Sequence, residues 1–275
     1  MKIRAGYEIV YDCPQPTPII LMLSVHPSRL ADLQTLDRMR LDAPIPVNTY
    51  YDGFGNFCHV IRAPRGRLTM SADFIVHDNG EPDVVAPEAE QHALEDLPVD
   101  ALVYLLGSRY CETDRLSDLA WSLFGQLPKG WPLVQAICDY VHDRIAFDYQ
   151  HASPTRTAFD AFAEQRGVCR DFAHLAVTLC RCMNIPARYC TGYLGDIGVP
   201  PAESPMDFSA WFEAYLGGQW HTFDARHNQP RVGRILMARG RDATDVAIAT
   251  SFGPCTLAGF KVVTEEVTST ATPAK

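Results

Sequence analysis

One cysteine of this chain lies where a nucleophilic thiol is expected, at the start of a predicted helix. Cys169 closely follows Gly167 and opens a run with apolar residues at helical spacing, which predicts a helix from about Cys169 to Met183. A helix N-terminus carries partial positive charge and free N–H groups, which favour a thiolate and can hold an oxyanion. We therefore expect a thiol pKa for Cys169 below the ordinary value of about 8.5. A structural cysteine in a core helix is the alternative, and this local context does not decide between the two.

Several ordered blocks of sequence around this cysteine resemble the transglutaminase-like superfamily. They lie between about Cys111 and Asn228 and include Arg166-Gly167-Val168-Cys169-Arg170-Asp171-Phe172-Ala173, Asn184-Ile185-Pro186-Ala187-Arg188-Tyr189 and Ala210-Trp211-Phe212-Glu213-Ala214-Tyr215. The resemblance implies a papain-like core, in which a cysteine at a helix start faces a histidine on one strand and an aspartate on the next. On this match, Cys169 is the nucleophile and Asp224 is the carboxylate that orients the base.

The histidine of the family pattern is a serine in this chain. Where the family has His-Ala-Trp, the sequence reads Ser209-Ala210-Trp211, and a serine hydroxyl cannot take up or return a proton near neutral pH. We therefore expect slow catalysis unless another residue moves the proton. If only the base has been lost, changing Ser209 to histidine should raise the activity by about 10²-fold or more.

Strand geometry predicts where Ser209 lies relative to Asp224. Gly217-Gly218 separates two expected strands and fits a two-residue hairpin turn. In that register Trp211 faces Asp224, so Ser209 and Asp224 project from one face of the sheet as diagonal neighbours. This is the arrangement that a histidine–aspartate pair would need.

Without a bulge in the hairpin, His221 and His227 are not expected to replace the missing base, while the sequence does not place His142 and His151. The same register places His221 and His227 on the opposite face of the hairpin. His174 lies five positions after Cys169, about 140° around the helix, and is interpreted as a core or interface histidine. No pair of histidines has convincing metal-ligand spacing, so we expect no metal, and the sequence suggests no other cofactor.

Two tryptophans and two arginines are candidates for binding the substrate. Trp211 and Trp220 could shape a groove for the acyl acceptor, although aromatic residues in strands more often belong to the core. Arg170 and Arg226 could bind a substrate carboxylate, although solvated surface charge is the more ordinary role. Of these four residues we expect Trp211 to contact the substrate.

The first hundred residues are rich in short strand-like runs separated by turn residues. The runs are Tyr7–Tyr11, Ile19–Val25, Phe57–Ile61 and Leu68–His77. They predict an antiparallel β domain over residues 1–98. The segment Glu81–Asp100, with three prolines among many acids, resembles a solvated linker. The N-terminal half is also similar to the β domain that precedes the core in a bacterial subgroup of transglutaminase-like cysteine peptidases.

From Glu112 onward, apolar residues recur at helical spacing. Helices are predicted from about Thr113, from Pro132 and from Cys169, followed by strands at Ala187–Leu194, Ser209–Leu216 and Gln219–Asp224. We expect an α+β fold whose papain-like, transglutaminase-like core covers residues 106–263 and follows the antiparallel β domain. Residues 264–275 are expected to form a flexible tail.

Composition excludes several classes of function. The chain has 275 residues, 47% of them hydrophobic, and a formal net charge of -9, so it lacks the positive field that binding nucleic acid or an anionic membrane requires. The longest apolar run, Ile19–Val25, is too short to span a bilayer, and the N-terminus does not resemble a signal peptide. The nine cysteines are a scattered set without a CxxC pair, and most should be buried in the core. We expect a cytoplasmic protein.

Three functions are compatible with these observations. The first is thiol-dependent acyl transfer, or hydrolysis of an amide in a peptide or protein, through a thioester on Cys169. The second is a catalytically degenerate module that binds a peptide in the same cleft without a general base. The third makes the β half a platform for a partner protein. An activated Cys169 should be alkylated far faster than the other cysteines, which would separate the first from the second. The sequence indicates neither the substrate nor the oligomeric state.

Overall fold

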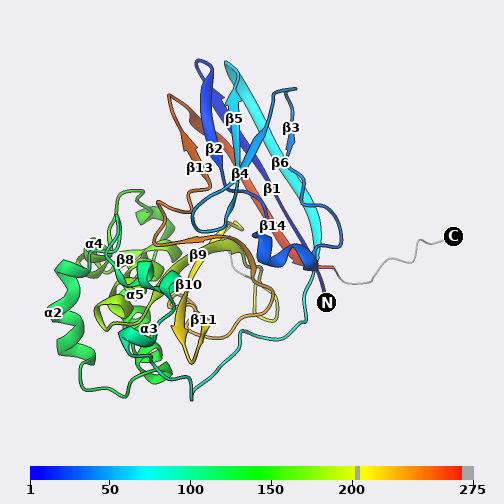
Figure 1. Ribbon diagram of the computed structural model, residues 1–275. Coiled ribbons are helices and arrows are strands. Elements are labelled where there is room, and N and C mark those ends of the chain that lie inside the picture. The colour runs from blue at the N-terminus through cyan, green and yellow to red at the C-terminus, as the bar shows by residue number, and fades with distance from the viewer. Residues whose placement is uncertain (202–204, 268–275) are drawn as a thin grey trace.

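The N-terminal half of the molecule is built from two four-stranded sheets (Figure 1). The computed structural model describes residues 1–201 and 205–267. The strand orders are β14-β1-β6-β3 and β13-β2-β5-β4, and every pair is antiparallel. The strands are β1 Lys2–Cys13, β2 Thr17–Leu21, β3 Arg40–Leu41, β4 Asn48–Tyr51, β5 Phe57–Ala63, β6 Gly66–His77, β13 Ala249–Ser251 and β14 Thr256–Glu266. Apolar side chains of both sheets, such as Ile9, Leu21 and Phe74, meet in one core.

The C-terminal half places helices against a further antiparallel sheet of order β11-β10-β9-β12. Its strands are β9 Ala187–Tyr193, β10 Ser209–Leu216, β11 Gln219–Phe223 and β12 Ile235–Gly240, and a short parallel pair joins β7 Ala146–Phe147 to β8 Arg166–Gly167. Its α-helices are α1 Val99–Leu102, α2 Thr113–Phe124, α3 Trp131–Arg144, α4 Ala158–Glu164 and α5 Cys169–Cys182. Short 3-10 helices lie at Pro27–Asp32, Leu94–Asp96, Val103–Leu105 and Tyr149–His151.

Helix α5 is the centre of this half. It is buried over nearly its whole length, packs against β9 and β10, and is surrounded by α2, α3 and α4 (Figure 1). The apolar spacing that predicts this helix in the sequence corresponds to side chains such as Leu175, Ala176 and Leu179, which are fully buried. The packing places Cys169, the first residue of α5, against the central strands β9 and β10 of the sheet.

The predicted elements of this half are confirmed. Helix α2 begins at Thr113 as expected, and α3 begins at Trp131, one residue before the predicted Pro132. Gly217 and Gly218 both have positive φ, 56° and 84°, which two-residue hairpin turns of type I′ require. The ladder from Leu216↔Gln219 to Phe212↔Phe223 has the register derived from the turn. The α+β fold class is therefore confirmed, with the papain-like arrangement of a helix start against an antiparallel sheet.

The expected boundaries between the halves need correction. The sequence-based division assigns residues up to 263 to the helical half, but β13 pairs with β2 and β14 pairs with β1 of the N-terminal half. The chain therefore returns to the N-terminal sheets after β12. Thr264 to Glu266 belong to β14 rather than to a flexible tail, and residues 268–275 of the expected tail lie outside the described residues. The sequence did not predict this return because the paired strands lie at opposite ends of the chain, and such distant pairing leaves no local pattern in the sequence.

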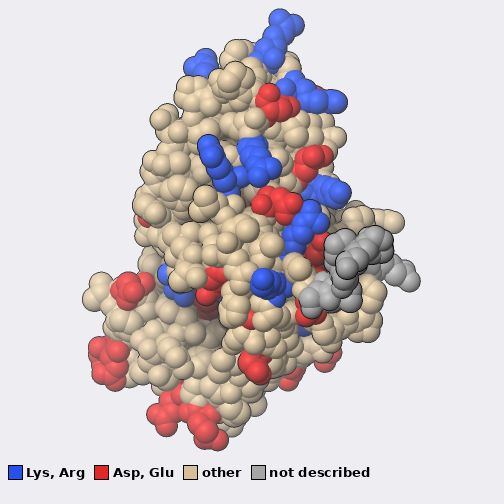
Figure 2. Space-filling view, turned by 90° about the vertical axis from the view of Figure 1, so that its right-hand side faces the viewer, with Lys and Arg blue, Asp and Glu red and all other residues tan. Residues whose placement is uncertain are grey.

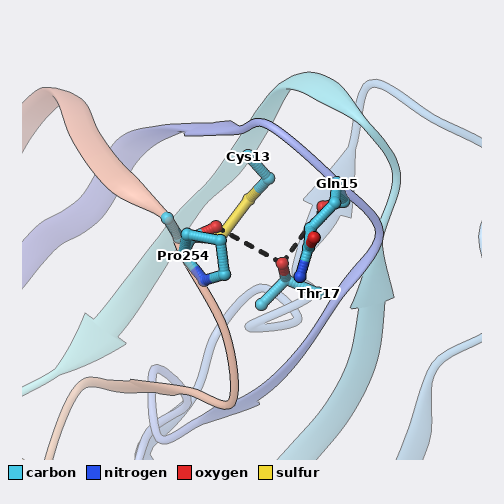
Figure 3. The surroundings of a disulfide bond; sticks show 5 residues. Cys13, Gln15, Thr17 and Pro254 are labelled. Carbon is cyan, nitrogen blue, oxygen red and sulfur yellow. Dashed lines mark hydrogen bonds between the residues drawn. A yellow bond between two sulfur atoms is a disulfide. The ribbon is translucent and has the colours of Figure 1, made fainter.

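A disulfide between Cys13 and Cys255 joins the end of β1 to the segment before β14 (Figure 3). Beside it, the hydroxyl of Thr17 donates to the carbonyl oxygens of Gln15 and Pro254 at 3.0 and 3.3 Å. The two cysteines are 242 positions apart, so spacing does not predict the bond. Six other cysteines are buried, as expected, and Cys169 is partly exposed.

Charge is distributed unevenly over the surface. Figure 2 shows lysine and arginine side chains over the upper, strand-built part of one face, whereas the lower end of that face shows mainly aspartate and glutamate. In residues 1–201 and 205–267, no helix has the length and apolar character needed to cross a membrane.

His174 is a core histidine of α5, as the sequence indicates. Its side chain is fully buried, its ring stacks on Tyr110 at 5.2 Å, and Nε2 accepts the backbone N–H of Ala243 at 3.1 Å. Burial lowers the pKa of His174 to about 3, because the charged imidazolium would lose its hydration. The folded protein therefore holds this histidine neutral at a pH where an exposed histidine is protonated.

We expect His174 to lower the free energy of unfolding as the pH is lowered below about 6.5. Below the unfolded pKa of about 6.5, the unfolded chain binds a proton that the folded chain does not bind until about pH 3. The free energy of unfolding should lose up to about 1.4 kcal/mol per pH unit across this window from His174 alone. Urea unfolding at several pH values should show a shallower slope for His174→Gln than for the wild type. An equal slope in the two proteins would contradict the expectation.

Candidate active site

Cys169 is the first residue of α5, and its sulfur lies against the beginning of β10, where it is hydrogen-bonded by the backbone N–H of Ala210. Burial raises the pKa of the Cys169 thiol to about 11, although the positive charge of Arg226 and the Ala210 N–H act in the opposite direction. Asp207 and Asp224 raise the pKa further through their negative charge. The sequence-based expectation of a lowered pKa is therefore wrong, because it considers the helix start and not the burial of the sulfur.

Contacts between Asp171 and the residues before Cys169 fix the start of the helix. Asp171 reaches back so that one carboxylate oxygen accepts the backbone N–H of Val168 at 2.9 Å and an N–H of Arg156 at 3.3 Å. A Cβ at Gly167 would lie only 2.5 Å from that oxygen, so this position needs glycine. The Gly-Val-Cys-Arg-Asp sequence thus builds a tight cap that holds Cys169 at the end of the helix.

Asp224 follows β11 directly, and its carboxylate is engaged by four donors. One oxygen accepts the backbone N–H groups of Arg226 and His227 at 3.0 and 3.1 Å. The other accepts Nδ1 of His227 at 2.8 Å and Nη2 of Arg234 at 2.9 Å. Burial by itself would raise the pKa of Asp224, but Arg234 and His227 outweigh it and hold the pKa well below its ordinary value. The carboxylate is therefore ionised and acts as an acceptor at neutral pH.

The position of His227 corrects the sequence-based prediction. Strand alternation places this histidine on the face opposite Asp224, but β11 ends at Phe223 and the chain then turns. The backbone N–H of Asn228 donates to the carbonyl of Asp224 at 2.8 Å, which brings His227 back onto the carboxylate. His221 remains in the strand, pairs with Ala214 as predicted, and packs edge-on against Trp131.

Ser209 begins β10 opposite Gly192 of β9 and is 6% exposed. By strand alternation it shares a sheet face with Asp224, although the β10–β11 ladder ends at Phe212↔Phe223, three residues from Ser209 and one from Asp224. Its hydroxyl is buried and has no hydrogen-bond partner among the described residues. The serine therefore does not take up the contact with Asp224 that a histidine would make.

A cavity of about 320 Å³ brings several of these residues together. Ser209, Arg226 and His227 line it, together with Tyr149 and Asp207. Two of the lining residues are close enough to Cys169 to interact with it electrostatically. The charge of Asp207 raises the pKa of the Cys169 thiol, and Cys169 raises the pKa of Tyr149. The cavity therefore adjoins the candidate nucleophile.

Trp211 is placed differently from the expectation that it contacts the substrate. Its side chain is 3% exposed, clusters with Cys190 and Leu236, and lies beneath the guanidinium of Arg234, 5.1 Å from the ring centre. It does not line the cavity beside Cys169, but it borders a second hollow of about 380 Å³. This position fits the alternative given by the sequence, that Trp211 belongs to the core. Contact of Trp211 with a substrate remains a prediction.

Sequence reasoning missed three residues that support Asp224. Arg234, which precedes β12, bridges Asp224 to Asp83, whose carboxylate accepts Nε of Arg234 at 2.8 Å and the backbone N–H of Arg231 at 2.9 Å. Asp83 lies in the segment expected to be a solvated linker, so this part of the linker is bound to the site. The third residue is His227, and its spacing of three from Asp224 within a turn was the available signal. No sequence pattern pairs Asp83 with Arg234.

The fold and this site define a thiol protein of papain-like architecture, and the comparisons with known proteins give the same family. A model of the transglutaminase-like superfamily matches residues 125–225, a range that contains Cys169, Ser209 and Asp224. A crystal structure from Cytophaga hutchinsonii, described as a candidate cysteine protease, is 32% identical with a TM-score of 0.84 over 99% of this chain and 93% of that chain. This chain belongs to the transglutaminase-like superfamily.

Sequence relatives extend the similarity to proteins without a described activity. An uncharacterised protein of Mycobacterium tuberculosis is 30% identical over 237 residues, which are 76% of this chain and 73% of the relative. An uncharacterised protein of Mycobacterium leprae is 36% identical over 97 residues, one third of each chain. These relatives support the family and indicate no substrate.

Proposed function

We propose that this protein catalyses thiol-dependent acyl transfer or hydrolysis at an amide of a peptide or protein. The observation that carries the proposal is Cys169 at the start of α5, hydrogen-bonded by Ala210 and adjoining a cavity that holds Arg226 and His227. The sulfur would attack the amide carbonyl, forming the C–S bond of a thioester while the C–N bond breaks and the leaving nitrogen receives a proton. Water or a second amine would then attack the thioester and return the proton to the sulfur.

The start of α5 also supplies groups for the developing oxyanion. The first N–H groups of a helix have no acceptor within the helix, and they point along the positive end of its dipole. Donors of this kind stabilise a tetrahedral intermediate when they are already in place before the reaction. The side chain of Asp171 holds this turn, so its geometry is fixed before substrate arrives.

Peptide or protein amides are the proposed substrate class. The family membership and the similarity to a structure described as a candidate cysteine protease support this class. The cytoplasmic location expected from the sequence remains a prediction, and the Cys13–Cys255 bond weighs against it because disulfides persist mainly in oxidising compartments.

One observation favours the alternative of a degenerate peptide-binding module. With a thiol pKa of about 11, only about one sulfur in 10⁴ would be a thiolate at pH 7. A binding relic would keep the cleft without needing that anion. The two proposals therefore differ in whether the bound substrate is converted.

Replacing Cys169 separates them. Cys169→Ala should lower amide hydrolysis or amine incorporation by at least about 10²-fold, because the thioester can no longer form. Cys182→Ala is the matched control, since this buried cysteine lies at the other end of α5 and should leave the activity unchanged. The assay follows ammonia release and amine incorporation on a glutamine-containing protein, with iodoacetamide labelling of each cysteine read by mass spectrometry. Equal activity in Cys169→Ala and the wild type would contradict catalysis by Cys169. Peptide binding by the wild type without turnover would support the degenerate peptide-binding module.

A further inference from the structure

We infer that His227, held by Asp224, carries the proton for chemistry at Cys169 in place of the histidine that the family has at position 209. The inference rests on the proposed function and adds a residue outside the range of the family match, which ends at residue 225. It concerns how the enzyme works without a base at Ser209. Four observations support it: the tautomer of the imidazole, its access to the cavity, the support behind Asp224 and the charges around the cavity.

The first observation is the tautomer of His227. Because the carboxylate of Asp224 is ionised, it can only accept, so Nδ1 of His227 must be the donor in their 2.8 Å hydrogen bond. The neutral ring therefore has its lone pair on Nε2, on the side of the ring away from Asp224. A general base needs this tautomer.

The second observation is access. The side chain of His227 is 20% exposed, and the residue lines the same cavity as Ser209 and Arg226. His221, the other histidine of this hairpin, is 4% exposed and packs against Trp131. Of these two, His227 is the ring that a substrate in the cavity could meet.

The third observation is the support behind the pair. Asp224 is bridged by Arg234 to Asp83, so the positive charge of a buried arginine lies between two carboxylates. Arg234 keeps Asp224 ionised, and an ionised carboxylate stabilises the imidazolium that forms when His227 accepts a proton.

The fourth observation is the charge around the cavity. The residues that line it with His227 include Tyr149, Asp196, Asp207, Arg226 and Arg231. The positive charge of Arg226 favours a thiolate on Cys169, whereas burial and the negative charge of Asp207 act against it. The cavity thus combines a cation near the sulfur with a ring that can receive the proton.

The proton transfers balance over one cycle. His227 Nε2 takes the proton of the Cys169 thiol as the sulfur attacks the carbonyl carbon. The imidazolium gives that proton to the amide nitrogen as the C–N bond breaks. In the second half, Nε2 takes a proton from water or an acceptor amine, and the sulfur receives it as the thioester is cleaved. Microscopic reversibility assigns both transfers to the same ring.

His227→Gln tests the inference against a purely structural role. Glutamine can still donate a hydrogen bond to Asp224 but cannot take up a proton, so a structural role predicts near wild-type activity. A proton carrier predicts a loss of about 10²–10⁴-fold in kcat and disappearance of the limb of the pH–rate profile that belongs to the imidazole. His151→Gln is the matched control, because His151 pairs with Asp148 at 2.7 Å with the same spacing of three, in an exposed position.

The outcomes distinguish this inference from the proposed function. Loss of activity in both Cys169→Ala and His227→Gln, with partial recovery of His227→Ala by added imidazole, supports both. Loss in Cys169→Ala with full activity and an unchanged pH profile in His227→Gln overturns the inference alone. A wild type without turnover, or one that Cys169→Ala does not affect, overturns the proposed function and the inference with it.

Discussion

Asp224→Asn is expected to reduce kcat/KM for amide turnover by about 10³-fold or more. An asparagine amide can present its NH₂ group to Nδ1 of His227, which favours the tautomer with the proton on Nε2, where the base must be free. The equivalent change in a serine protease triad costs about 10⁴-fold for this reason. The reaction rate should be measured by ammonia release under conditions where circular dichroism shows the variant to be folded.

The same substitution should also reduce stability. It removes one of the two carboxylates around the buried guanidinium of Arg234, and breaking a buried ion pair costs about 3–5 kcal/mol. Asp83 remains as a partner of Arg234, so we expect a loss at the lower end of that range. Asp148→Asn, which changes the exposed pair with His151, serves as the control and should alter neither quantity strongly. A kcat/KM within threefold of the wild type in folded Asp224→Asn would contradict the role assigned to this carboxylate.

Local sequence signals account well for the helical half of the fold. The apolar spacing after Cys169 predicts α5 to within one residue, and the two glycines at 217 and 218 predict both the hairpin and its register. Each of these features depends on residues that are neighbours in the sequence. The same holds for Ser209, whose departure from the family pattern is visible without coordinates.

The features that were missed depend on residues far apart in the chain. The Cys13–Cys255 bond, the pairing of β14 with β1 and the contact of Asp83 with Arg234 all join distant segments. The pKa of Cys169 belongs with them, because burial by several packed elements outweighs the local effect of the helix start.

His227 was misplaced for a different reason. Strand alternation holds only while the ladder continues, and β11 ends at Phe223. The prediction extended that alternation by four residues into a turn, where an aspartate and a histidine three positions apart can pair. The candidate site could therefore be located from the sequence, while its proton carrier could not.

The four hydrogen bonds that Asp224 already accepts change the effect on activity that we expect from Ser209→His. Its two oxygens already accept four N–H donors, so a second imidazole at position 209 would find no free acceptor to fix its tautomer. We expect Ser209→His alone to change the activity by less than about threefold, in contrast to the increase expected from the sequence alone. Removing the ring of His227 should release one acceptor site on Asp224.

The double variant Ser209→His, His227→Ala should therefore recover about 10²-fold of the activity that His227→Ala loses, which is the usual scale of general acid–base catalysis. The new ring would approach Asp224 from β10, and the cavity beside Ser209, about 320 Å³ in volume, can accept it. Single-turnover rates with a glutamine-containing protein measure the recovery, and Cys169→Ala in the same background should abolish it. An increase of about 10²-fold from Ser209→His in the presence of His227 would instead show that Asp224 is available to a second base and that His227 is not the proton carrier.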